Sequence, residues 1–93
     1  MAGVFSPAGP LTLAGVGTTL EQGRRFAAEG GGVVDFAAVT DVDSVALALL
    51  FDWMRTARAA GHAITLRNAS PSLASLADVY GVRELLPLED ASP

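Results

Sequence analysis

The stretch from residue 33 to residue 61, VVDFAAVTDVDSVALALLFDWMRTARAAG, decides the fold. Its first four residues place Val34 and Phe36 at a spacing of two, the period of a strand. Residues 37–42 are expected to form a loop. Residues 44–60 predict the strongest helix in the chain, with Asp43 as the N-cap and Gly61 at the position of a C-terminal left-handed glycine. A strand followed by a capped helix is typical of an α/β fold.

On either side of this stretch, strands continue to alternate with helices. The expected order is β-β-α-β-α-β-α plus a short terminal element, which gives an α/β fold with a small mixed β-sheet covered by helices. The outer elements are two short strands or a hairpin (4–5 and 11–13), a helix at 19–29 capped by Thr18 or Thr19, a strand at 62–67, a helix at 71–80 and a closing element at 82–88.

The composition favours one globular domain over residues 1–93. The chain is 51% hydrophobic and 17% charged, and it has no cysteine, which excludes disulfides and thiolate zinc sites. Ten carboxylates against six basic residues make nucleic acid a poor partner. The longest apolar run, 45–51, is too short to insert into a membrane. Residues 1–10 lack the pattern of a secretory signal, so we expect a cytoplasmic protein.

No arrangement of residues typical of catalysis is visible, and neither a cofactor nor a metal site is expected. His62 has no nucleophile or carboxylate at a motif spacing. The glycines 30–32 follow a helix and precede a strand, the reverse of a phosphate loop, and are interpreted as a flexible connection. Asp35, Asp41 and Asp43 favour helix capping; they could also form a weak divalent-ion site, although they lack the spacing of a calcium loop.

The long helix carries the functional signal. At about 100° per residue, its predicted core stripe has Trp53 on one flank, whereas Asp52 falls on the solvated face. Val45 and Leu49 also fall on that face, next to Ser44 at the helix start. Two interpretations remain open: these apolar residues are incidental, or they form a docking patch. Tyr80 is expected to be a core anchor. The predicted core stripe is Ala46, Leu47, Leu50, Met54 and Ala57, with Phe51 also at its edge.

An ordered series of segments resembles a STAS domain, the domain of sulphate transporters and anti-sigma-factor antagonists. The series runs through 33–36, 43–50, 57–62, 66–68, 73–77 and 80–87. The resemblance implies a small β-sheet covered by helices. It also implies a shared motif at the start of the second helix, an aspartate followed by one or two hydroxyl residues and then usually glycine.

Here that motif is Asp43-Ser44-Val45-Ala46. The second hydroxyl, which kinases phosphorylate in antagonists of this family, is replaced by Val45. A single hydroxyl after the aspartate is similar to the MlaB type of stand-alone STAS protein. That resemblance implies a non-catalytic cytoplasmic subunit, peripheral to the inner membrane, of an ABC phospholipid transporter that maintains outer-membrane lipid asymmetry. It would bind the ATPase subunit, and through it the permease, with Asp43, Ser44, Val45 and Leu49.

The alternative is an anti-sigma-factor antagonist regulated by phosphorylation, with Ser44 as the candidate phosphorylation site. A phosphate adds about −1.5 to −2 charges, which would repel a docked partner beside Asp41 and Asp43. An enzyme is the least supported class, because no nucleophile–base pair is visible.

Overall fold

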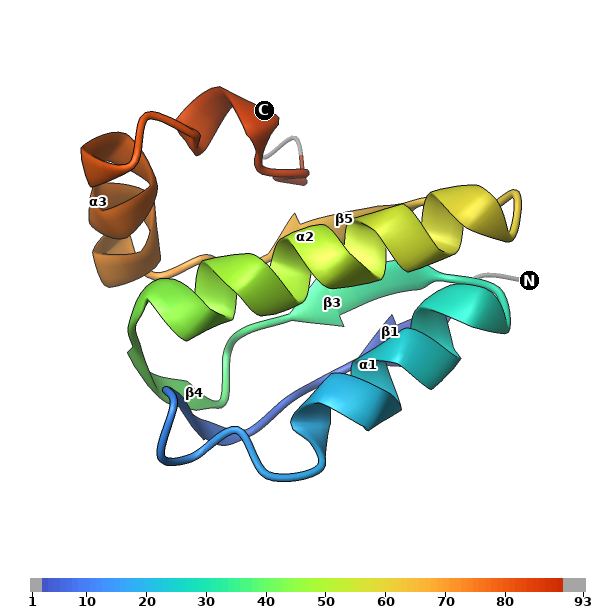
Figure 1. The fold of residues 1–93 in the computed structure, drawn as a ribbon, viewed down its shortest axis with the longest axis horizontal. Helices are drawn as coiled ribbons and strands as arrows, with labels where there is room; N and C mark the ends of the chain where they lie inside the picture. Colours follow the sequence, from blue (N-terminus) through green and yellow to red (C-terminus); the bar gives the residue numbers. More distant parts are fainter. Residues whose placement is uncertain (1–2, 90–93) are drawn as a thin grey trace.

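The computed structural model describes residues 3–89, and the elements alternate as an α/β fold requires (Figure 1). The predicted fold class is confirmed. The elements are β1 (Gly3–Phe5), β2 (Gly9–Leu11), α1 (Thr19–Ala28), β3 (Gly32–Asp35), β4 (Val39–Val42), α2 (Ser44–Ala59), β5 (Ile64–Arg67), α3 (Pro71–Val79) and a 3₁₀ helix (Arg83–Leu85).

The strands form two small sheets. One has the order β1-β3-β5, and the other pairs β2 with β4. Every pairing between these strands is parallel, whereas a mixed sheet was expected. β1 and β2 belong to different sheets, so they do not form the hairpin that was one of two expectations. The loop expected at 37–42 is also wrong, because β4 lies there and is stabilised by pairing with a strand about 30 residues earlier in the chain.

The starts of two of the three α-helices, α2 and α3, have the side-chain caps that the sequence predicts. The Asp43 carboxylate accepts a hydrogen bond from the Val45 amide at the start of α2, and Ser70 caps α3 in the same way, ahead of Pro71. Thr18 precedes α1 but makes no side-chain cap, so its predicted capping hydrogen bond is absent. Among residues 3–89, no helix combines the length and apolar character that crossing a membrane requires.

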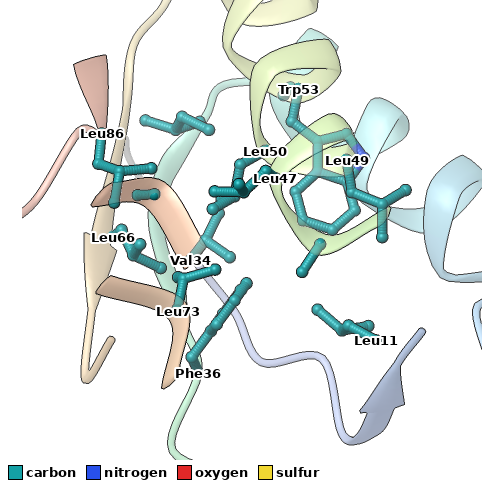
Figure 2. Packing of buried hydrophobic residues seen from close by; sticks show 14 of the residues in the cluster. Leu11, Val34, Phe36, Leu47, Leu49, Leu50, Trp53, Leu66, Leu73 and Leu86 are labelled. Carbon is teal, nitrogen blue, oxygen red and sulfur yellow. The ribbon is translucent and has the colours of Figure 1, made fainter. Parts of the chain in front are cut away.

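The core lies between the three-stranded sheet and the helices. Figure 1 shows α1 and α2 side by side across the same face of β1 and β3, with α3 near the N-terminal end of α2. Figure 2 shows how leucines of α2 meet Val34 of β3, Leu66 of β5 and Leu73 of α3. The largest fully buried side chains are Trp53, Leu11, Leu50, Leu66, Leu73 and Val34.

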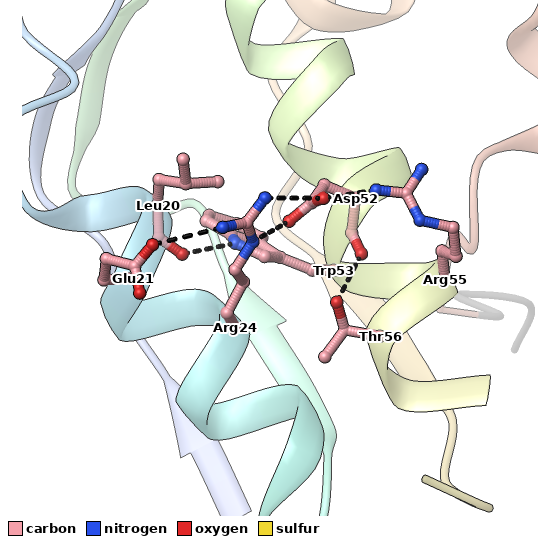
Figure 3. Close-up of polar contacts among 7 residues, drawn as sticks. All are labelled: Leu20, Glu21, Arg24, Asp52, Trp53, Arg55 and Thr56. Atoms are coloured by element: carbon pink, nitrogen blue, oxygen red, sulfur yellow. Dashed lines mark hydrogen bonds and ion pairs between the residues drawn. The ribbon is translucent and has the colours of Figure 1, made fainter. Parts of the chain in front are cut away.

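Trp53 of α2 packs against α1. Its side chain is fully buried, more so than the flanking position predicted, and its indole N–H donates to the Leu20 carbonyl at 3.1 Å (Figure 3). Phe5 meets the indole edge to face, with ring centroids 5.6 Å apart. Gly23 lies directly against the indole, where a Cβ atom would overlap the ring. A glycine inside a helix is unfavourable on its own, so the close approach of the indole explains why residue 23 is glycine.

The glycines at 30–32 are a structural requirement rather than the flexible connection expected. All three have positive φ angles. A Cβ on Gly31 would overlap the Ala63 carbonyl, and one on Gly32 would overlap the backbone of Gly3. The turn therefore brings β3 between its two neighbours, at a distance that only glycine allows.

Candidate interaction surface

The start of α2 is held in place by Asp43, which joins two segments. One carboxylate oxygen accepts from the Val45 amide at 2.8 Å, and the other accepts from the Leu13 amide at 3.2 Å. Both oxygens of Asp43 are thereby engaged within the chain, and the loop after β2 is tied to the first turn of α2. Asp43 therefore positions Ser44.

Ser44 is exposed at the first position of α2, as predicted, but Leu49 is not exposed. Leu49 retains 4% of its accessible surface, so its predicted place on the solvated face is wrong. The reason is α1, which lies along α2 and covers the helix side that a wheel of α2 alone leaves to solvent. Val45 is half-buried. In this structure Leu49 is a core residue, and it cannot present its side chain to a partner.

Asp52 is the second residue that α1 covers, and it was also expected in solvent. It retains 9% of its accessible surface. Arg24 of α1 binds it through two nitrogens at 2.7 and 3.2 Å, and Arg55 approaches it at 2.6 Å (Figure 3). The hydrogen bond from Arg24 is the main reason that the pKa of Asp52 lies below its ordinary value, and burial opposes this effect. This ion pair links α1 to α2 on the side of α2 that α1 covers.

A shallow apolar depression of about 310 Å³ opens beside Ser44, on the side of α2 away from α1. We call it the Ser44 depression. Tyr80 forms one wall and is 58% exposed, so its predicted role as a core anchor is wrong. Its neighbour Val79 is 80% exposed. Helix α3 ends before Tyr80, so the side chain does not continue the buried stripe of Leu73 and Ala77. The residues lining the Ser44 depression are Ser44, Leu47, Phe51, Tyr80 and Val82.

The predicted acidic cluster does not converge on one point. Asp35 accepts hydrogen bonds from the Asn68 side chain and the Ala37 amide, each at 2.9 Å. The Asn68 bond is the first cause that holds the pKa of Asp35 below its ordinary value. Asp43 is engaged at the α2 cap, and Asp41 is exposed on β4. Within residues 3–89, no three potential metal-ligating side chains come together.

The sequence predicts the position of Ser44 but not the aromatic side chains beside it. Phe51 was placed at the edge of the core stripe, but it is half-buried and lines the Ser44 depression. The sequence signal for the position of Tyr80 is Gly81, which directly follows it and has a positive φ. A tyrosine at the last turn before such a glycine lies where the helix stops shielding it from solvent.

Comparisons with known proteins agree with this fold. A family model described as "Mlab, STAS domain" matches residues 2–87. The anti-sigma factor antagonist SpoIIAA, solved in its unphosphorylated form, is similar in structure with a TM-score of 0.59. The two sequences are 22% identical, and the alignment covers 96% of this chain and 79% of the SpoIIAA chain. Comparison with curated protein sequences gave no match.

Proposed function

Because the chain belongs to the STAS domain family, in the group described as MlaB, we propose that it is a non-catalytic subunit of an ABC phospholipid transporter. In this proposal it binds the ATPase subunit and is held by it at the cytoplasmic side of the inner membrane. The observation that carries the proposal is the exposed Ser44, presented by a capped helix start beside an apolar depression.

The chemistry of this surface suits a protein partner. Interfaces have a desolvated apolar centre, enriched in aromatic residues, and a polar rim. Phe51 and Tyr80 supply aromatic area, and Ser44 supplies a hydroxyl at the edge. The Asp43 carboxylate holds the helix start that carries Ser44, so the surface is formed before a partner arrives. Such preorganisation lowers the ordering cost of binding.

The experiment is co-purification of the tagged protein from its native host, comparing the wild type with Ser44→Arg. The proposal expects the wild type to retain an ABC ATPase and its permease, and Ser44→Arg to lose both while remaining folded. Ala28→Arg is the matched control, since it adds the same side chain to an exposed position of α1. Retention of the ATPase by Ser44→Arg, or absence of an ATPase from the wild type, would contradict the proposal.

A phosphorylation-regulated antagonist is the second candidate, favoured by the structural similarity to SpoIIAA. Val45 opposes it, because this residue stands where such antagonists carry the phosphorylated hydroxyl. Recovery of a serine kinase in the same experiment, with Ser44 phosphorylated, would select this candidate.

A further inference from the structure

The three-stranded sheet is extended beyond β5 by residues 87–89. The Leu66 amide donates to the Pro87 carbonyl at 2.6 Å, and the Glu89 amide donates to the Leu66 carbonyl at 2.8 Å. These two bonds are those of a parallel pair in which Leu88 is the partner of Leu66. Because β3 pairs with the other side of β5, residues 87–89 form the outer edge of the sheet.

The backbone groups of Leu88 face away from β5. Successive residues of a strand direct their N–H and C=O groups to opposite sides, so the residue between Pro87 and Glu89 points both groups outward. Neither group makes a backbone hydrogen bond within residues 3–89. The Leu88 side chain is 46% exposed, and it lines two hollows of about 500 and 380 Å³ that both also include Arg83. This edge therefore has room and hydrogen-bonding groups for an added strand.

We infer that a second copy of this chain pairs with this edge, with the two Leu88 residues opposite each other in antiparallel strands. The pairing is self-complementary, because a residue with both groups outward exchanges two N–H···O=C bonds with its symmetry mate. The two leucines also form an apolar cross-strand pair. Glu89 then lies opposite Pro87 of the second copy, so the pairing places no two carboxylates directly against each other.

The opposite edge of the sheet offers less contact to a second copy. Gly3 donates to the Gly31 carbonyl at 3.2 Å, so the next residue, Val4, directs its backbone groups outward from β1. Gly3 has no side chain to add to such a contact, whereas Pro87 supplies apolar surface beside Leu88. Val4 is therefore a matched control position, with the same backbone orientation at the other edge.

The expected dimer is weak and sensitive to salt. One exchanged pair of hydrogen bonds and one leucine pair bury much less than the roughly 1,200 Å² typical of stable specific interfaces. Each chain has a formal net charge of −4, so two copies repel each other at long range. Salt screens this repulsion. Association should therefore strengthen between about 50 and 500 mM salt, whereas a contact made by opposite charges would weaken.

The first test follows sedimentation and amide chemical shifts of the labelled protein between about 0.05 and 2 mM, where contacts of millimolar affinity become populated. We expect the Leu88 and Glu89 amides to shift with concentration. Leu88→Pro removes only the outward N–H and keeps both backbone bonds to Leu66, so it should weaken the dimer at least tenfold without unfolding the domain. Val4→Pro removes the outward N–H of β1 and should leave the dimer within about twofold of the wild type.

A second test uses the two-fold symmetry, which places residue 88 against its own counterpart. Leu88→Asp and Leu88→Lys should each be monomeric, since like charges would face each other across the axis. Mixing the two variants should restore a dimer, because the charges are then opposite. With only one variant isotopically labelled, its residue 88 amide should shift on addition of the other variant. No contact between different surfaces of the two copies predicts this recovery.

Three results would overturn the inference. The first is a wild type that stays monomeric up to about 2 mM at high salt. The second is a dimer that Leu88→Pro leaves unchanged or that Val4→Pro abolishes. The third is loss of the ABC ATPase from Leu88→Pro in co-purification, which would assign this edge to that partner. The proposed function is tested separately, because ATPase binding through Ser44 does not require the sheet edge.

Discussion

Replacement of Gly23 by alanine should destabilise the protein, although helix propensity alone predicts the opposite. Alanine is better than glycine inside a helix by about 1 kcal/mol. The new Cβ atom, however, would overlap the indole of Trp53, which is fully buried. Overpacking of this kind costs about 1–3 kcal/mol. Moving the indole would also break its 3.1 Å bond to Leu20, worth about 1 kcal/mol.

Together these terms give a net loss of about 2 kcal/mol, with packing and the hydrogen bond outweighing propensity. For a domain of this size, each kcal/mol lowers the melting temperature by roughly 4–8 °C, so we expect a decrease of about 10 °C. The measurement is thermal and urea unfolding followed by circular dichroism. Fluorescence gives a second probe, because Trp53 is the single tryptophan.

A neighbouring site provides the control. Gln22 is exposed in the same helix turn, so the difference in stability between Gln22→Gly and Gln22→Ala measures propensity alone. Trp53→Phe in the Gly23→Ala background should recover part of the loss, since the smaller ring leaves room for the methyl group. If Gly23→Ala raised stability by the amount seen at Gln22, the packing argument would be refuted.

Three further changes test other parts of the structure. Asp52→Asn should cost roughly 1–3 kcal/mol at neutral pH by removing the charge that Arg24 binds. Folding lowers the pKa of Asp52. The contribution of Asp52 to stability is therefore present above the carboxyl's ordinary pKa and is lost as the pH falls below about 4. The stability of the Asp52→Asn variant should accordingly fall less steeply with acid than that of the wild type. Leu49→Asp should unfold the domain by burying an unpaired charge, and a folded Leu49→Asp that only loses its partner would contradict the core assignment. Gly32→Ala should prevent close pairing of β3 with β1, and it should lower the stability to urea by more than Gly81→Ala does. The alanine at position 81 meets no atoms and bears only the left-handed backbone cost of about 1–2 kcal/mol. Equal losses of stability would show that β1 and β3 can move apart without cost.

Local signals account for most of the fold that the sequence predicted. Asp43, Ser70 and Gly61 act through neighbours a few residues away, so the bounds of α2 and α3 follow from reading the chain locally. β4 could not be found in this way, because the short segment 39–42 is extended only through its pairing with β2. The parallel pairing of every strand likewise depends on contacts between distant segments.

The candidate site shows the same division. Ser44 was found because its position follows from the cap of its own helix. Leu49 and Asp52 were misplaced because α1, which buries them, is distant in sequence, and one helix wheel gives no information on a second helix. Tyr80 was misplaced for a local reason: the apolar period was extended one residue past the end of α3.

The parallel register of the sheet has a consequence for the order in which the chain folds. Gly3 pairs with Gly32, and Gly32 pairs with Ile64, so each neighbour of β3 is about 30 residues away. During synthesis, β1 has no strand to pair with until α1 and β3 have been made, and β3 remains open on its other side until β5 follows. The bridge between Leu66 and Leu88 forms only after residue 88 has been made. Contacts of such long sequence separation slow folding, so β1 and β3 expose unpaired strand edges on the ribosome until β5 has been made.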